Sequence, residues 1–260
     1  MRGWWRLYAT SVGLGLRHLT RHGYLREAVV RTVIPLDPVR YVELPWALRA
    51  LAAVPGERVL DLASPKLLAV ALARSGVHVT SVDELPPEIE AWRRLTRGER
   101  NLELVVADGR ALPFADASFD HATSISVLEH VADDGDATAL GELARCVRPG
   151  GRIAITLPFA RRAWDEYRRE AAYVDRGGDE RGHFFQRWYD DERVDALLAR
   201  VPELRLRERT VVRLVPNWHR AYTRAFPWLV PLGPLYGVLA VERAGEGGDV
   251  VRLLLERARS

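Results

Sequence analysis

The 260-residue sequence is poor in cysteine and has no long apolar run. Cys146 is the only cysteine, so no disulfide can form within the chain and no cysteine-based metal site can be built. This favours a reducing, cytoplasmic environment, and we expect no bound metal. No apolar stretch reaches the roughly 20 residues that a membrane-spanning helix needs. The apolar stretch from Leu7 to Leu16 lacks a following small-residue cleavage site, so we do not expect a signal peptide.

Lysine is almost absent, because Lys66 is the only one and arginine supplies the remaining basic side chains. The formal net charge is only +3. A groove that follows a phosphate backbone needs a dense basic run with interleaved aromatic residues, and the sequence has none. We therefore expect no nucleic-acid partner.

A regular alternation of short apolar runs and helical segments is present from residue 58 onward. Hydrophobic residues make up 48% of the chain and charged residues 28%, a balance that can build a large core. Strands that alternate with helices of about ten residues predict a doubly wound α/β fold with a mostly parallel, seven-stranded sheet. The strands are expected at residues 58–62, 77–82, 102–106, 121–125, 152–157, 204–215 and 237–241.

Three parts of the chain are expected. Residues 1–45, broken by prolines, are predicted to form an N-terminal helical cap, and residues 46–243 the main domain. Residues 244–260 are predicted to be a helical tail, with an exposed amphipathic helix over residues 249–259.

Polar residues follow the predicted strands where each one ends. In an open α/β sheet, ligands bind at the carboxyl ends of the strands near the topological switch point. Asp61, Asp83 and Asp108 end or follow the first three strands, and residues 126–130 follow the fourth. An acid after the second strand can accept hydrogen bonds from two ribose hydroxyls, in a nicotinamide site as in an S-adenosylmethionine site. The alternative role for each acid is a helix N-cap or a solvated loop end.

The order of short motifs along the chain is more specific than any one acid. The motifs are Val59-Leu60-Asp61-Leu62, Val82-Asp83, Ala107-Asp108-Gly109 with Leu112-Pro113-Phe114, Ser118-Phe119-Asp120, Ser126-Val127-Leu128-Glu129-His130-Val131 and Arg148-Pro149-Gly150-Gly151. This series resembles class I S-adenosylmethionine-dependent methyltransferases, closely over residues 58–159 and elsewhere by strand order alone. The resemblance implies a doubly wound fold and a methyltransferase that takes S-adenosylmethionine as cofactor. A nicotinamide oxidoreductase would need a G-x-G-x-x-G after the first strand, and none is present.

The resemblance also implies roles for individual residues. Asp83 would bind the ribose hydroxyls, Asp108 the adenine amino group, and Gly109 would let the backbone approach the ring. Asp61 would lie under the loop that faces the methionine amino group. Two further residues would line the methionine moiety, Ser126 and Val127.

One loop departs from the family pattern. The first strand of such enzymes leads into a glycine-rich loop, whereas residues 61–68 contain no glycine. Ala63 and Ser64 are small enough for close approach, and Ser64 followed by Pro65 predicts a helix start whose N–H groups could meet a carboxylate. Lys66 would then pair with that carboxylate, or lie solvated on the first turn. The alternative function is a non-catalytic binding or scaffold protein whose loop no longer binds the cofactor.

Methyl transfer requires the positioning of two reactants and needs a general base only when the acceptor carries a proton of high pKa. We take His130 and His183 as candidate catalytic residues. The alternatives are that His130 begins the helix after the fourth strand and that the aromatic cluster around His183 packs on the sheet.

Two aromatic segments favour a small, lipophilic acceptor. Residues 2–24 combine tryptophan with arginine, and residues 216–236 form a proline-rich aromatic insertion. Such stretches also contact membrane surfaces, form a homodimer contact or cover a core. Because related enzymes cover the active site with N-terminal helices, the resemblance implies that residues 4–24 form a lid.

Overall fold

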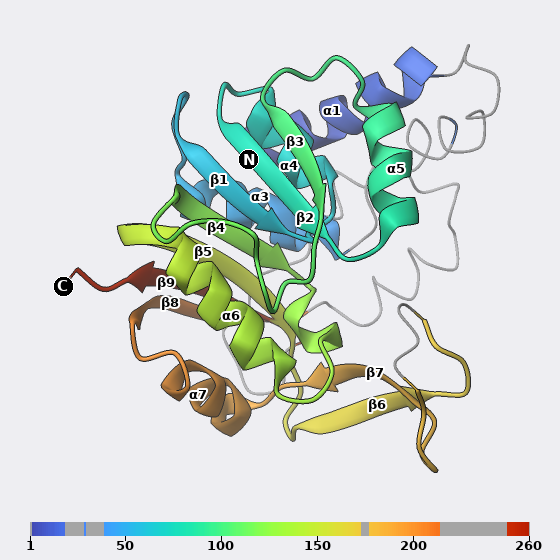
Figure 1. The fold of residues 1–260 in the computed structure, drawn as a ribbon, viewed down its shortest axis with the longest axis vertical. Coiled ribbons are helices and arrows are strands. Elements are labelled where there is room, and N and C mark those ends of the chain that lie inside the picture. The colour runs from blue at the N-terminus through green and yellow to red at the C-terminus, as the bar shows by residue number, and fades with distance from the viewer. Residues whose placement is uncertain (1, 19–28, 30–38, 173–176, 214–248, 260) are drawn as a thin grey trace.

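The computed structural model describes residues 2–18, 29, 39–172, 177–213 and 249–259. Its centre is a seven-stranded sheet with the order β3-β2-β1-β4-β5-β9-β8 (Figure 1). The strands are β1 (Arg58–Leu62), β2 (His78–Asp83), β3 (Leu102–Val106), β4 (Phe119–Ile125), β5 (Val147–Pro158), β8 (Leu204–Val212) and β9 (Val250–Arg257). The five strands from β3 to β5 are parallel, whereas β9 runs antiparallel to both of its neighbours. The predicted doubly wound fold is confirmed.

Helices cover both faces of this sheet, because its strands carry apolar residues on both sides. On one face a hydrophobic cluster joins Val59 of β1 to α1 (Arg2–His18), α3 (Arg40–Leu51), α4 (Leu67–Ala73) and α5 (Pro86–Leu95). On the other face, the next residue, Leu60, belongs to a cluster with α6 (Gly135–Cys146) and α7 (Asp191–Ala199). The connection from β1 to β2 passes over the first face of the sheet, and the connection from β4 to β5 passes over the second face. The strand order therefore reverses between β1 and β4, which is the topological switch point.

The N-terminal helices are part of this layered core. Leu7 and Leu14 of α1 are fully buried, and α1 contacts α3 and α4. Helix α3 runs across residue 45, where we expected a cap to end and the main domain to begin. The lid expected over residues 4–24 lies partly outside the described residues.

The C-terminal tail differs from its prediction. Residues 250–257 are strand β9, which lies between β5 and β8, and they are not an exposed helix. The continuous apolar run Leu253-Leu254-Leu255 suits a strand buried on both faces. The charges of Arg252 and Arg257 gave the segment a misleading amphipathic pattern. The strand expected at 237–241 and the insertion at 216–236 lie outside the described residues.

A small hairpin was not predicted. Strands β6 (Trp164–Arg168) and β7 (His183–Trp188) pair antiparallel, and the rings of Trp164 and Trp188 stack 5.7 Å apart. The hairpin lies beyond the carboxyl end of the parallel strands, and β7 contacts the short 3-10 turn η1 (Leu128–His130) (Figure 1). None of the helices that the structure describes is long and apolar enough to cross a membrane.

Candidate functional site

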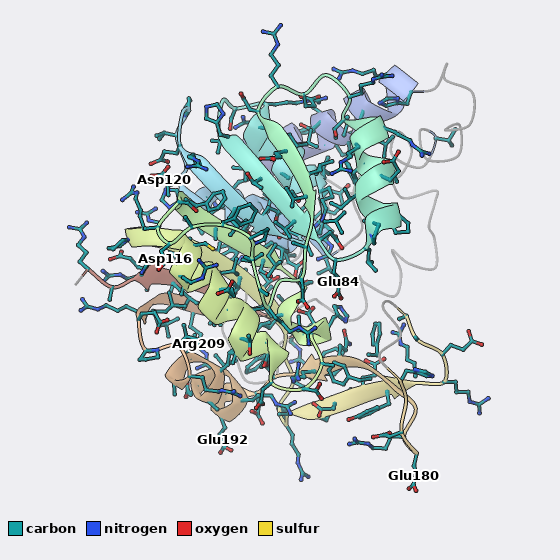
Figure 2. The ribbon with its side chains drawn as sticks, viewed as in Figure 1. Glu84, Asp116, Asp120, Glu180, Glu192 and Arg209 are labelled. Carbon is teal, nitrogen blue, oxygen red and sulfur yellow. The ribbon has the colours of Figure 1, made fainter. Side chains whose placement is uncertain are left out.

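A cavity of about 150 Å³ lies at the carboxyl ends of β1 to β4, next to the switch point. Figure 2 shows Glu84, one of its lining residues, at the other end of the sheet from Asp120, which lies near the start of β4. Six of the residues that we expected to contact a cofactor line this cavity: Ala63, Asp83, Asp108, Gly109, Ser126 and Val127. Residues from four separate loops therefore converge on one space, as the strand order requires.

Asp83 ends β2 and is 7% exposed. Its Oδ1 accepts a hydrogen bond from the Leu85 backbone N–H at 3.1 Å, and its Oδ2 accepts one from Lys66 Nζ at 2.8 Å. Each carboxylate oxygen can accept two hydrogen bonds, so the group keeps acceptor capacity toward the cavity.

The loop after β3 supplies Asp108 and Gly109. Arg110 holds the Asp108 carboxylate through its own backbone N–H and through its guanidinium, at distances down to 2.6 Å. A Cβ added at Gly109 would lie 2.9 Å from Leu62 Cδ1. Gly109 thus allows close packing against Leu62, and both residues line the cavity.

The glycine-free loop after β1 keeps a conformation that normally favours glycine. Ala63 has φ of 49°, and its N–H donates to the Val82 carbonyl at 2.7 Å. Ser64, predicted as a helix cap, is instead 1% exposed, and its Oγ accepts from the Ile125 N–H at 2.9 Å. The residue that precedes α4 is Lys66, which makes no side-chain cap. The tight turn directs the Ser64 hydroxyl inward, so it cannot cap the helix.

Asp61, Ser64 and Lys66 are not among the residues that line the cavity; they form a buried network behind it. Asp61 is fully buried, and its Oδ2 accepts from Ser81 Oγ at 2.6 Å, while its Oδ1 has no hydrogen-bond partner in the described part of the chain. Burial raises the pKa of the Asp61 carboxyl, and the nearby Lys66 ammonium opposes that rise. From the sequence we expected all three residues at the cofactor site. The structure places them behind the residues that line the cavity.

Sequence reasoning missed Glu43, a fully buried residue of α3. Its Oε1 accepts from Ser126 Oγ at 2.6 Å and from Thr156 Oγ1 at 2.8 Å, and Arg40 pairs with its Oε2. Ser126 has φ of 55°, so this contact fixes a strained residue of the cavity wall. A charged residue within the apolar segment Tyr41-Val42-Glu43-Leu44-Pro45-Trp46 was the only signal in the sequence.

Glu129 lies close to this cluster and is 2% exposed. Its Oε2 has no hydrogen-bond partner among the residues that the structure describes. Burial and, to a smaller extent, the charge of Glu43 raise the pKa of Glu129 to about 8. The carboxyl group therefore holds a proton at neutral pH.

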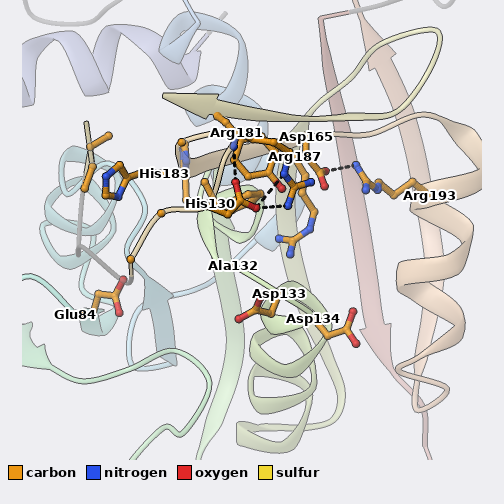
Figure 3. A pocket seen from close by; sticks show the side chains of 18 residues that line it. Glu84, His130, Ala132, Asp133, Asp134, Asp165, Arg181, His183, Arg187 and Arg193 are labelled. Atoms are coloured by element: carbon orange, nitrogen blue, oxygen red, sulfur yellow. Dashed lines mark hydrogen bonds and ion pairs between the residues drawn. The ribbon is translucent and has the colours of Figure 1, made fainter. Parts of the chain in front are cut away.

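A second cavity of about 630 Å³ adjoins the first and shares Glu84 and His130 with it (Figure 3). Aromatic and charged side chains of the β6–β7 hairpin line it, among them Tyr167, His183, Phe184 and Arg187. Asp165 and Arg193 form an ion pair of 2.8 Å at its edge. The structure thus brings both candidate catalytic histidines to the same cavity.

The ring of His130 is held in one orientation. Its Nδ1 lies 2.7 Å from the Phe185 carbonyl oxygen, which can only accept, so Nδ1 carries the hydrogen. In the neutral ring the lone pair is then on Nε2, which lies 3.8 Å from Glu129 Oε1. Burial lowers the pKa of His130, so the ring is neutral at pH 7 and able to accept a proton. His130 belongs to η1 and not to the α-helix that follows.

No group of three or more histidine, cysteine, aspartate or glutamate side chains with a metal-binding arrangement occurs among the residues that the structure describes. A doubly wound sheet with an acid at the end of β2 and a cavity at its switch point is a usual setting for a nucleotide-cofactor site. The family model described as "Methyltransferase domain" matches residues 60–155, which contain the wall of the smaller cavity. The resemblance of this segment to methyltransferases, predicted from its motifs, is confirmed.

Curated relatives carry a more specific name. Demethylmenaquinone methyltransferase of Clavibacter sepedonicus is 40% identical over 131 residues, which are 48% of this chain and 53% of that protein. The protein of the same name from Mycobacterium sp. (strain KMS) is 36% identical over 134 residues, 50% of this chain and 54% of the other. The chain thus spans about half the length of the curated relatives it matches.

Solved structures share the fold at low identity. A coclaurine N-methyltransferase bound to N-methylheliamine and S-adenosylhomocysteine is 16% identical, with a TM-score of 0.55 over 82% of this chain and 69% of that one. A sarcosine dimethylglycine methyltransferase from Galdieria sulphuraria, named as putative, is 17% identical, with a TM-score of 0.55 over 90% of this chain and 88% of that one. The [4+2]-cyclase SpnF has a TM-score of 0.57 at 15% identity over 84% of this chain and 80% of that one. The fold alone therefore does not define the reaction.

Proposed function

We propose that this chain transfers a methyl group from S-adenosylmethionine to a small, lipophilic acceptor. The observation that carries the proposal is the pair of adjoining cavities. One is lined by the residues expected to contact a cofactor, the other by His130 and His183, and His130 borders both. Together their volumes fall within the roughly 300–1,000 Å³ of typical ligand sites.

The residues present fit the cofactor. When bound, S-adenosylmethionine would supply a sulfonium methyl group: a nucleophile on the acceptor would bond to the methyl carbon as the sulfur–carbon bond breaks and S-adenosylhomocysteine leaves. Asp83 would accept hydrogen bonds from the ribose hydroxyls, and Asp108 would bind the adenine amino group. Gly109 leaves room for the ring, and Ala63 preserves the left-handed turn of the usual glycine loop. Ser126 and Val127 would lie along the amino-acid tail.

For an acceptor with a hydroxyl group, His130 would take up the proton as the new bond to carbon forms. Its neutral state and fixed tautomer suit it to that step. Relatives named demethylmenaquinone methyltransferases make a reduced quinone ring with an apolar tail the first acceptor class to test. The aromatic and charged side chains of the larger cavity suit such a polar ring.

The test has two measurements on the purified full chain. Calorimetry with S-adenosylhomocysteine should show binding, and a methyl-transfer assay with a reduced demethylated quinone should show product. His130→Gln should reduce the transfer rate by about 10²–10⁴-fold and leave S-adenosylhomocysteine binding nearly unchanged. His78→Gln is the matched control, because His78 is exposed at the start of β2 and lines neither cavity.

Absence of cofactor binding would refute the proposal and favour the non-catalytic scaffold. Full transfer activity in His130→Gln would refute the role of His130 alone.

A further inference from the structure

We propose that Lys66 is a positioning residue that holds the Asp83 carboxylate correctly oriented for the ribose of the cofactor, in place of the missing glycine loop. This inference rests on the proposed function, since it assumes that the smaller cavity binds a nucleoside. It assigns a role to the only lysine of the chain, which the family pattern does not explain.

The first observation is where Lys66 lies. Its side chain is 3% exposed, and it is not among the residues that line the cavity. Its Nζ lies 2.8 Å from Asp83 Oδ2 and 3.4 Å from the Ser64 carbonyl oxygen. Burial of an ammonium is costly unless it is paired, so the contact with Asp83 is the reason that Lys66 can lie there. Lys66 thus approaches Asp83 from behind, while Asp83 faces the cavity.

The second observation is the geometry of Asp83. The Leu85 N–H occupies one acceptor position on Oδ1, and Lys66 Nζ occupies one on Oδ2. Because each oxygen accepts two hydrogen bonds, one position remains on each. Two adjacent ribose hydroxyls need that pair of acceptors. Lys66 and Leu85 therefore fix the plane of the carboxylate from two sides and leave its other edge for the ligand.

The third observation is the local charge balance. Asp61 and Asp83 end neighbouring strands, and both are buried. The charges of Lys66 and Asp83 act on Asp61 in opposite directions, the first lowering its pKa and the second raising it. The other titratable groups around the cavity are Glu84, His130 and the pair that Asp108 forms with Arg110. Without Lys66, Asp83 in the cavity wall and Asp61 behind it would lack the nearby cation that offsets their negative charge.

The experiment uses the purified full chain, Lys66→Met and Lys66→Arg. Each is titrated calorimetrically with S-adenosylhomocysteine and with 5′-methylthioadenosine, which keeps the ribose but lacks the amino-acid carboxylate. We expect Lys66→Met to weaken both ligands by the same factor, roughly 10- to 100-fold at neutral pH. The loss should arise because the Asp83 carboxylate is then free to turn away from the ribose hydroxyls. Lys66→Arg keeps the charge and a hydrogen-bond donor for Asp83, so it should restore much of the affinity.

A matched double variant separates positioning from a merely structural role. Asp61→Asn together with Lys66→Met removes one carboxylate with the ammonium but still leaves Asp83 without its donor, so both ligands should bind more weakly than to the unaltered chain. Because this pair removes one buried negative charge and one buried positive charge together, the double variant can still be titrated if Lys66→Met alone fails to fold.

Four results would overturn the inference. They are unchanged binding in Lys66→Met, tighter binding in Lys66→Met, a loss confined to S-adenosylhomocysteine, and a loss in Lys66→Arg as large as that in Lys66→Met. Tighter binding would mean that Lys66 obstructs the cavity, and a loss confined to S-adenosylhomocysteine would mean that Lys66 binds the tail carboxylate directly. Failure of the unaltered chain to bind either ligand would overturn the proposed function and the inference with it, whereas the four results above overturn the inference alone.

Discussion

Glu129→Gln should stabilise this protein at neutral and higher pH. Glu129 is 2% exposed, and its Oε2 has no hydrogen-bond partner within the described residues. Burial, aided by the charge of Glu43, raises the pKa of Glu129 from 4.5 to about 8. The folded protein therefore holds a proton that the unfolded chain releases above pH 4.5. Glutamine reproduces the protonated carboxyl group in size and has no proton to lose.

The size of the effect follows from proton linkage. A group whose pKa is raised on folding contributes its full stability below the unfolded pKa and loses it as the pH rises toward the folded pKa. Between pH 4.5 and about 8 the free energy of unfolding should fall by about 1.4 kcal/mol per pH unit. At pH 7 the cost to the unaltered protein is about 3 kcal/mol, and above pH 8 it levels off at about 5 kcal/mol.

Urea unfolding followed by circular dichroism measures this cost. Glu129→Gln and the unaltered chain should differ by less than about 1 kcal/mol near pH 5 and by about 3 kcal/mol at pH 7. Glu90→Gln is the matched control, because Glu90 forms an exposed pair with Arg94 within α5 and should change stability by less than about 0.5 kcal/mol. A difference for Glu129→Gln that is constant with pH, or a loss of stability at pH 7, would refute the reasoning.

Three glycine substitutions test how tightly the fold and the cavity wall are packed. Gly151→Ala would place a Cβ 2.2 Å from the Asp120 carbonyl oxygen, so it should lower the free energy of unfolding by about 3 kcal/mol. Gly141→Ala in α6 meets no atom of the described residues within 4 Å and should raise the free energy of unfolding by about 0.5–1 kcal/mol. Similar urea midpoints for the two variants would contradict this. Gly109→Ala would push the flexible end of Leu62 toward the cavity, so it should weaken S-adenosylhomocysteine binding about tenfold in calorimetry while the midpoint changes little. Unchanged affinity would show that the cavity wall is not tightly packed there.

The parallel half of the fold was predictable because its strands are short apolar runs that end in acids. Asp83 and Asp108 stand where such strands stop, and the topology alone brings them to one cavity. Strand β9 was not predictable in the same way, because Arg252 and Arg257 within an apolar run imitate a helical face. The β6–β7 hairpin is held by aromatic and cation–π contacts, such as Trp164 on Trp188, that have no short-range pattern.

Positions in the site that depend on three-dimensional packing were missed. Glu43 precedes Ser126 by 83 residues and meets it only once α3 packs on the sheet. Lys66 and Asp83 are 17 residues apart, and nothing in the sequence says that the ammonium points inward and not to solvent. The conformation of Ala63 is imposed by its hydrogen bond to Val82 across the strands, against the usual preference of alanine.

The measurement that tests the central claim most directly is calorimetric titration of S-adenosylhomocysteine into the full chain and into Asp83→Asn. The claim predicts micromolar binding by the unaltered chain and a loss of about 10- to 100-fold in Asp83→Asn, because the amide keeps only one of the two acceptor oxygens. No binding at millimolar ligand, or equal affinity in both proteins, would contradict a cofactor site built on Asp83.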